Sequence, residues 1–253
     1  MARVFITGST EGLGRAAAQQ LVRDGHEVLL HARSPERAEA VADLPAIGVA
    51  VGDLSRAADV RSVAEQVNAL GRVDAVIHNA GVYLQRERGA TPEGHAVTLA
   101  VNTLAPYLLT ALVTRPDRLV YLSSGLHRGG AGSLADIDWR SRRWDAGQAY
   151  AESKLQLVAL ALALARRWPD VLSNAVDPGW VRTRMGGASA PVDLDTGQRT
   201  QSWLAASDDP AAMVSGGYWR DHQQQAPAPE ALSRDFQDRL LARLAELTGV
   251  ALP

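Results

Sequence analysis

Short apolar segments alternate with longer amphipathic segments along most of the chain. The apolar segments are rich in Val, Ile and Leu, and they cover 4–7, 28–32, 47–51, 73–78, 118–123 and 171–176. Because they show no polar alternation, they are typical of strands buried on both faces of a parallel sheet. Helical patterns cover 12–24, 35–43, 55–70, 92–113 and 148–167. The repeated strand–helix order predicts an α/β fold with a single doubly wound parallel sheet and right-handed crossovers.

The last third of the chain has a weaker pattern. Region 184–230 is the least regular and contains several glycines and a QQQAPAP run at 223–229. An irregular excursion between late elements of an α/β fold commonly covers a substrate, so we expect a substrate-binding lid here. An amphipathic pattern over 231–248 predicts a closing helix that ends at Gly249. Since there is no internal repeat and no long linker, residues 1–253 are expected to form one domain.

Composition and charge exclude several classes of protein. The formal net charge is −2, so no basic excess indicates a nucleic-acid or membrane-surface partner. Cysteine is absent, which excludes disulfides, thiolate metal sites and a cysteine nucleophile. The six histidines show no metal-ligand spacing, so no metal is expected. The N-terminus has no signal-peptide pattern and the apolar segment 155–165 is too short to span a bilayer, so a cytoplasmic protein is expected.

A glycine-rich turn follows the first predicted strand. The stretch TGSTEGLG places Gly8, Gly12 and Gly14 between that strand and a helix. Gly8 allows the tight turn, Gly12 lets a pyrophosphate approach the backbone, and Gly14 permits close helix–strand packing. The free N–H groups of the helix N-terminus attract phosphate. This context favours a dinucleotide-binding turn over a glycine-rich turn that binds nothing.

The stretch YAESK at 150–154 contains the only lysine of the chain, since the other members of its 26 basic residues are arginines. Helical spacing of i and i+4 places Tyr150 and Lys154 on one face. A nearby ammonium lowers the pKa of a phenol, which would let the tyrosine exchange a proton near neutral pH. A compact ammonium and a planar guanidinium are not interchangeable, which gives a physical reason for one lysine among the arginines.

The glycine spacing G-x-x-x-G-x-G resembles that of the classical short-chain dehydrogenases/reductases, and further motifs of that family follow in order. These motifs are GDL at 52–54, HNAG at 78–81, VNTLAPYLLT at 101–110, YLSSG at 121–125, YAESK at 150–154 and DPGWVRT at 177–183. The resemblance covers essentially all of 3–185. It implies a Rossmann-type fold and an oxidoreductase in which a nicotinamide dinucleotide supplies or accepts hydride.

The resemblance also implies a catalytic set of four residues. Tyr150 would act as the acid/base, and Lys154 would tune it and hold the nicotinamide ribose. Ser124 would polarise the substrate carbonyl, with the preceding serine as the alternative. Asn102 would help to hold a water that relays protons. This asparagine could instead satisfy backbone groups near Pro106, which removes a helical hydrogen bond.

The cofactor site implied by the resemblance draws on six segments of the chain. Its residues are Gly8, Ser9, Thr10, Gly12, Leu13, Gly14, Arg33, Asp53, Leu54, Asn79, Ala80, Gly81, Tyr150, Lys154, Pro178, Gly179, Val181 and Thr183. An NAD site generally has an acidic residue after the second strand, whereas 28–35 contains none. The guanidinium of Arg33 suits a 2′-phosphate, so we expect NADP(H) rather than NAD(H), although Arg33 could also be an ordinary solvated residue. Glu11 is a counterargument, because many NADP-preferring relatives have a basic residue there.

The long segment between Ser124 and Tyr150 resembles the retinol-dehydrogenase-like subset of the family, as does 216–229. This resemblance points to a bulky apolar aldehyde, ketone or alcohol. The tentative pocket walls are Trp144, Trp180, Met185 and Trp203. The alternative is a surface loop whose tryptophans pack locally.

The sequence therefore favours an NADP(H)-dependent ketoreductase or alcohol dehydrogenase that acts on a small-to-medium apolar substrate, and it leaves a homo-oligomer open. Two other functions stay open. An epimerase or dehydratase would use the same Tyr150–Lys154 pair with tightly held NAD, and the glycine spacing counts against it. A dinucleotide-binding sensor would have lost catalysis, and the complete catalytic set counts against that.

Overall fold

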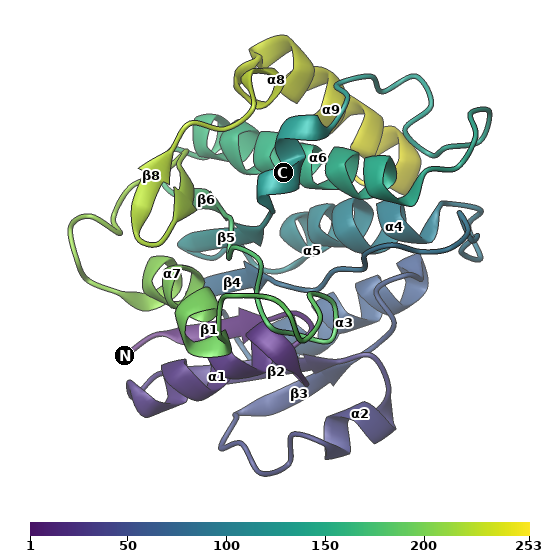
Figure 1. The fold of residues 1–253 in the computed structure, drawn as a ribbon. Coiled ribbons are helices and arrows are strands. Elements are labelled where there is room, and N and C mark those ends of the chain that lie inside the picture. Colours follow the sequence, from purple (N-terminus) through teal and green to yellow (C-terminus); the bar gives the residue numbers. More distant parts are fainter.

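The computed structural model describes residues 1–253, which form one eight-stranded sheet covered by helices on both faces (Figure 1). The strands are β1 (Arg3–Ile6), β2 (Glu27–Ala32), β3 (Gly48–Val51), β4 (Ala75–His78), β5 (Arg118–Leu122), β6 (Leu172–Val176), β7 (Tyr218–Arg220) and β8 (Gln223–Gln225). Their order is β3-β2-β1-β4-β5-β6-β7-β8, and only the β7–β8 pair is antiparallel. The predicted doubly wound parallel sheet is confirmed, and each of the six predicted strands is present.

The helices fall largely where the pattern predicts them. They are α1 (Gly12–Arg23), α2 (Pro35–Glu39), α3 (Ala57–Ala69), α4 (Val97–Leu99), α5 (Ala105–Leu112), α6 (Ala146–Arg167), α7 (Leu194–Ala206), α8 (Pro229–Leu232) and α9 (Arg234–Thr248). The single helix predicted over 92–113 is instead interrupted by a π-helical segment, Ala100–Leu104, which separates α4 from α5. The predicted end at Gly249 is confirmed, because this residue adopts the left-handed conformation (φ 67°) that closes many helices.

The two faces of the sheet are set by alternation along each strand. Successive side chains of a strand point to opposite faces, so Val4 and Ile6 pack with α1 and the end of α7, whereas Phe5 joins the other cluster. That larger cluster includes α3, α5 and α6. Helix α6 is apolar on all sides over 157–165, and it is buried over 149–164 because α8 and α9 cover the side that faces away from the sheet (Figure 1). This helix is therefore a middle layer of the molecule.

The region 184–230 is more regular than the sequence predicts. Helix α7 begins at an N-cap, Asp193, whose carboxylate accepts the Thr196 N–H at 2.7 Å, and it packs against α1. The helical pattern of α7 is hard to recognise in the sequence, because many of its residues are polar and because it contains Gly197. That glycine permits close packing, since a Cβ there would lie 2.6 Å from Val181 Cγ2. The irregular part of the expected lid is thus confined to the loop between β6 and α7 and to the connections around β7 and β8.

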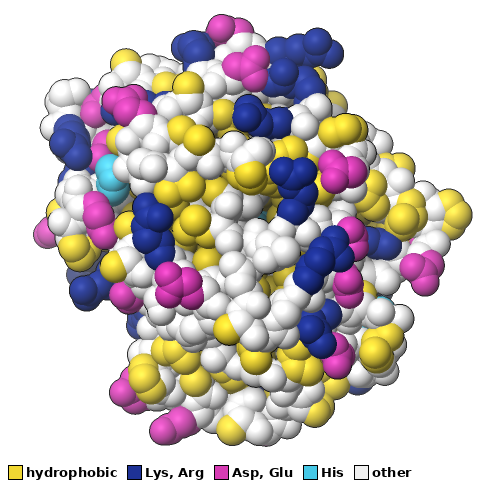
Figure 2. All heavy atoms as spheres, turned by 180° about the vertical axis from the view of Figure 1, so that it is seen from behind, with side chains coloured by type: hydrophobic (Ala, Val, Ile, Leu, Met, Phe, Trp, Pro, Cys, Tyr) yellow, Lys and Arg dark blue, Asp and Glu magenta, His cyan; other side chains and the backbone are white.

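Two surface properties complete the description of the fold. On the face shown in Figure 2, basic and acidic side chains are interspersed among small hydrophobic areas, so the charges of that face largely offset each other. None of the helices combines the length and the apolar composition that crossing a membrane requires.

Candidate active site

Most of the predicted site residues meet at one edge of the sheet, in the loops that follow β1 to β6. The order of the sheet reverses direction between β1 and β4, so the crevice at their carboxyl ends is the expected ligand position in such a fold. The glycine-rich turn follows β1, the HNAG motif ends β4, and the catalytic serine follows β5. Topology therefore brings these segments together although they are far apart in sequence.

The glycine-rich turn forms a cradle that a dinucleotide fits. Gly8 and Gly12 have positive φ of 63° and 57°, and a Cβ on Gly14 would collide with the carbonyl of Gly8. The N-cap of α1, Glu11, makes no side-chain cap, so the first N–H groups of the helix stay available to phosphate. The Asn79 amide braces the turn by donating to the carbonyl oxygen of Thr7 at 2.9 Å.

The remaining cofactor residues divide into those that border this groove and those that support it. Thr183 borders it, because its Cγ2 lies 3.6 Å from where a Cβ of Gly12 would be. The side chain of Ser9 supports the groove and does not face it. Its Oγ is buried, donates to the Ile6 carbonyl at 3.0 Å and accepts the His31 N–H at 2.8 Å. Leu54 is also buried, next to Asp53, whose carboxylate accepts the Ser55 N–H at 2.9 Å.

The adenosine end of the groove is rich in arginine. Arg33 is exposed at the carboxyl end of β2. Arg37 pairs with Glu11 at 2.7 Å and approaches the Thr10 hydroxyl at 3.4 Å. Glu11 lies 3.8 Å from Arg184 as well. The negative charge of Glu11, which counts against binding of a 2′-phosphate, is therefore offset by the guanidinium groups of Arg37 and Arg184.

Tyr150 and Lys154 project from the same side of α6 into the buried end of the groove. The Lys154 ammonium lies 5.5 Å from the Tyr150 ring centroid and donates to the Leu122 carbonyl at 2.7 Å. Burial lowers the pKa of Lys154 to about 8. Burial likewise raises the pKa of Tyr150 to about 12, and a hydrogen bond with the Ser124 side chain only partly opposes this. The lowering of the Tyr150 pKa that the sequence predicts is not found, because burial dominates, and the phenol stays protonated at neutral pH.

The two adjacent serines have different environments. Ser123 is buried and donates to the carbonyl of Lys154 at 3.0 Å, which uses its hydroxyl for structure. Ser124 is partly exposed beside Tyr150 and caps the 3₁₀ helix Gly125–Gly129, because its Oγ accepts the Leu126 N–H at 3.2 Å. That N–H occupies an acceptor position, so the hydroxyl hydrogen of Ser124 is available as a donor, either to the Tyr150 oxygen or to a ligand that binds beside it.

Asn102 lies in the π-helical segment and is fully buried. Its side chain accepts the Val82 N–H at 2.8 Å and donates to the Val82 carbonyl at 3.0 Å and to the Ser153 hydroxyl at 3.0 Å. The backbone groups that it satisfies are thus those of Val82 and not those near Pro106. A π-helical turn is common at functional positions, and here it points the amide at the loop that follows β4.

Large apolar side chains lie in the loops that follow the strands at the site. The ring of Tyr83 lies 4.4 Å from that of Tyr150, and Leu84, Leu126, Trp180 and Met185 are large hydrophobic side chains that stay exposed. They belong to the loops after β4, β5 and β6, which are neighbouring strands. Trp180 and Met185 are two of the tentative pocket walls, and that role stays a prediction. The sequence analysis does not select Tyr83, Leu84 and Leu126, although their place in loops after predicted strands could have indicated them.

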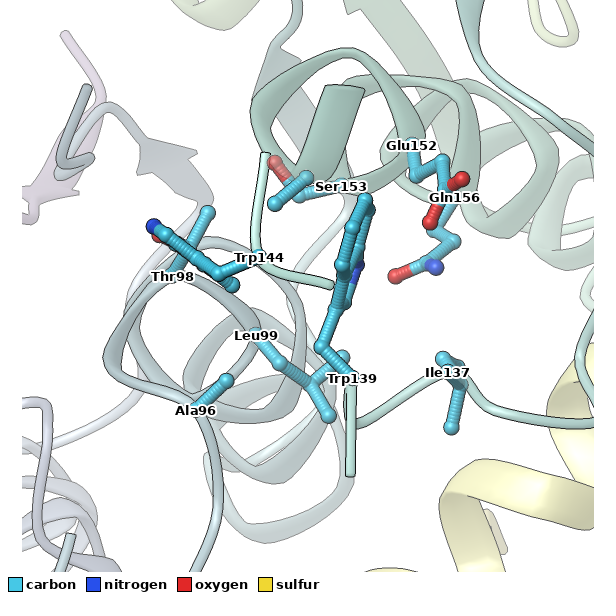
Figure 3. Close-up of a pocket in the computed structure, with 10 residues that line it drawn as sticks. Ala96, Thr98, Leu99, Ile137, Trp139, Trp144, Glu152, Ser153 and Gln156 are labelled. Atoms are coloured by element: carbon cyan, nitrogen blue, oxygen red, sulfur yellow. The ribbon is translucent and has the colours of Figure 1, made fainter. Parts of the chain in front are cut away.

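Trp144 packs within the long insert. Its ring meets Trp139 edge-on at 5.4 Å, and its Nε1 donates to the Gln85 carbonyl at 3.0 Å. Figure 3 shows both indoles beside a cavity of about 10 Å³, also lined by Ser153, which has room for a water-sized molecule at most. The local-packing alternative therefore describes Trp144 better, although its bond to Gln85 supports the loop beside Tyr83.

Trp203 does not join the site, which corrects its prediction as a pocket wall. It lies near the end of α7, where it stacks on His222 at 4.7 Å and meets Trp219 at 5.5 Å. It faces a polar surface groove of about 560 Å³ between α1 and α7. That groove includes Asp24 and lies toward the amino ends of the strands, at the edge opposite Tyr150.

Two buried histidines beneath the groove predict acid sensitivity. His31 Nδ1 accepts the Gly8 N–H at 3.0 Å while Nε2 donates to the Gly52 carbonyl at 2.9 Å, and burial lowers its pKa. Burial also lowers the pKa of His78 to about 3. Both rings are neutral in the folded chain but take up a proton near pH 6.5 once unfolded. The free energy of unfolding should therefore fall as the pH drops below about 6.5, with a loss from His78 of about 2 kcal/mol between pH 6.5 and 5.

Urea unfolding at these two pH values measures this loss. His78→Phe keeps a ring against Tyr121, which stacks on His78 at 4.6 Å, and should show a smaller pH slope than the native chain. His222→Asn replaces an exposed histidine and should keep the native slope. Equal slopes in the native chain and His78→Phe would contradict the assignment.

Comparison with known proteins agrees with this geometry. The family model described as short chain dehydrogenase matches residues 2–192. Short-chain dehydrogenase chry4 of Gibberella zeae is 39% identical and the match covers 100% of this chain and 99% of that protein. Human retinol dehydrogenase 13 is 30% identical over 99% of this chain and 85% of its own length, in line with the predicted likeness to that subset.

A solved structure gives the same result for the fold. The crystal structure of an uncharacterized protein from Mycobacterium Paratuberculosis has a TM-score of 0.86 and 29% identity, and the match covers 100% of this chain and 95% of that one. Fold, order of motifs and sequence relatives agree, and the chain is a member of the short-chain dehydrogenase/reductase family of oxidoreductases.

Proposed function

We propose that the protein is an NADP(H)-dependent oxidoreductase that interconverts a carbonyl and an alcohol on a small-to-medium apolar substrate, with Tyr150 as acid/base. The observation that carries this proposal is the juxtaposition of Tyr150, Ser124 and Lys154 beside the glycine cradle. When bound, a nicotinamide dinucleotide supplies or accepts the hydride. The glycine-rich turn, Asn79 and Thr183 would hold it along the groove.

The protein's own residues would handle the proton and the carbonyl oxygen. The hydroxyl hydrogen of Ser124 would donate to that oxygen and stabilise negative charge as it develops there. The Tyr150 phenol, protonated at neutral pH, would deliver its proton to the same oxygen in the reductive direction. The Lys154 ammonium is held by the Leu122 carbonyl and would stabilise the phenolate that remains. Asn102 would complete a path for proton return.

Arginine at the adenosine end supports a preference for NADP(H). Arg33 is free of carboxylate partners, whereas Arg37 is already paired with Glu11. A hydrogen bond to a charged phosphate contributes about 1.5–3 kcal/mol, so Arg33→Ala should lower the ratio of kcat/KM for NADPH to that for NADH by roughly 10- to 100-fold. Arg23→Ala, at the far end of α1, should leave the ratio unchanged. An NADH preference in the native chain, or an unchanged ratio in Arg33→Ala, would remove Arg33 from this role.

The apolar residues at the mouth of the site support an apolar substrate. Trp180 is 57% exposed beside the site, so its indole is available to a ligand. Trp180→Ala should raise KM for all-trans-retinal several-fold more than for benzaldehyde, because a bulky substrate covers more apolar surface. Trp203→Ala is the matched control and should change neither KM. An equal effect of Trp180→Ala on both substrates would show that the indole only packs.

A further inference from the structure

His127 is fully buried three positions after Ser124, in the 3₁₀ helix that follows β5. Its Nδ1 lies 2.7 Å from the Ser124 carbonyl oxygen, and its Nε2 lies 2.9 Å from the backbone nitrogen of Ala228. A carbonyl oxygen can only accept and a backbone N–H can only donate, so Nδ1 carries the proton and Nε2 carries none. Burial lowers the pKa of His127, in agreement with a neutral ring. Both nitrogens are occupied, and one tautomer is fixed.

We infer that His127 is a positioning residue for Ser124, and that it acts through its Nδ1–H donor to the Ser124 carbonyl, whose tautomer is fixed by the bond from the Ala228 N–H at the other end of this tie. The inference rests on the proposed function, in which Ser124 polarises the substrate carbonyl. Two further contacts hold the same loop. Arg128 donates to the Ala226 carbonyl at 2.6 Å, and the His127 ring packs on Tyr218 of β7 at 4.6 Å.

The consequence for Ser124 is that its backbone and its hydroxyl oxygen are both fixed. The backbone is extended (φ −164°, ψ 152°), and its carbonyl accepts from the His127 ring and from the His127 N–H at 3.0 Å. The Oγ accepts the Leu126 N–H. Only the hydroxyl hydrogen remains to be aligned by substrate. A displacement of about 1 Å at a reacting group can cost roughly 100-fold in rate, so the tie bears directly on turnover.

Two conservative substitutions test the bond to the Ser124 carbonyl and the bond from the Ala228 N–H separately. In His127→Asn the side-chain amide can donate to the Ser124 carbonyl in place of Nδ1, but it is too short to reach Ala228. In His127→Gln the longer amide can accept the Ala228 N–H in place of Nε2, and the donor next to Ser124 is lost. We expect His127→Asn to keep kcat within about threefold and His127→Gln to lose about 10- to 100-fold in kcat. The dissociation constant for NADPH, measured by fluorescence, should be unchanged in both.

A third variant perturbs the tie without replacing the histidine. Ala228 has φ −58°, which proline can adopt, and Ala228→Pro replaces the N–H that fixes the tautomer by a ring carbon that faces Nε2. It should lower kcat with NADPH affinity retained. His222→Asn, whose ring is exposed and stacks on Trp203, is the matched histidine control and should keep native kcat.

The outcomes are distinguishable from a failure of the proposed function. Tyr150→Phe and Ser124→Ala are measured in parallel with benzaldehyde and NADPH. If these two variants keep native turnover, the proposed function fails and the inference fails with it. If they lose turnover while His127→Gln and Ala228→Pro keep it, the inference alone is overturned. The inference is also overturned if His127→Asn and His127→Gln lose the same factor in kcat and their kcat losses follow their losses of stability in urea. Such a result indicates a role in folding only.

Discussion

Replacing Tyr150 with phenylalanine is expected to lower kcat by roughly 10³-fold while NADPH binding is retained. The hydroxyl is the group that exchanges a proton with the substrate oxygen, and general acid–base catalysis typically contributes about 10²–10⁴-fold. The ring would stay in place, because it is buried against Tyr83 and beneath the same loops. Steady-state rates with benzaldehyde and NADPH measure kcat, and fluorescence of bound NADPH measures affinity.

A second tyrosine provides the control for this substitution. The Tyr107 hydroxyl donates to the Val250 carbonyl at 2.8 Å, in the segment that follows α9, so Tyr107→Phe should lower stability slightly and leave kcat near native. If Tyr150→Phe turned over like Tyr107→Phe, the phenol would not be the proton carrier.

Lys154→Arg is expected to reduce kcat/KM by at least about 100-fold although the charge is kept. Lys154 is 4% exposed, and its ammonium lies 3.4 Å from where a Cβ of Gly81 would be, so a guanidinium has no space at the same position. Arginine also cannot reproduce a point charge with three rotatable donors, one of which is bound to the Leu122 carbonyl. We expect KM for NADPH to rise as well, because the same group would hold the nicotinamide ribose.

The reverse substitution on the same helix tests whether the effect is specific. Arg166 forms an ion pair with Asp238 near the end of α6, and Arg166→Lys should change kcat/KM by less than about twofold. Lys154→Met keeps the length of the side chain without the charge and should be as impaired as Lys154→Arg. Near-native turnover in Lys154→Arg would refute the explanation offered for the lone lysine.

Much of the site could be predicted from the sequence because it is encoded locally. The Gly8–Gly12–Gly14 turn and the Tyr150–Lys154 pair are short patterns with fixed geometry, and a parallel sheet places the loops after its strands at one edge. Properties that depend on tertiary burial were not accessible in this way. The raised pKa of Tyr150 is one example, since the desolvation that causes it comes from loops distant in sequence.

The errors share a physical cause. Trp203 was assigned to the pocket because α7 was not predicted, and α7 was not predicted because polar residues and Gly197 obscure its period. Once the helix is known, its packing on α1 carries Trp203 to the opposite edge. The exposed side chains of Leu84 and Leu126 and the two ring contacts of His127 likewise arise from loops that fold onto each other, which no local pattern specifies.

The middle-layer position of α6 has a consequence for the order in which the protein is made. Translation proceeds at about 5–20 residues per second, so the α9 helix that covers α6 is completed roughly 4–16 seconds after α6 itself. During that interval the nascent chain carries an apolar helix with one uncovered side, which can associate with other unfinished chains or be held by chaperones. Native packing of α6 must therefore await the synthesis of α9.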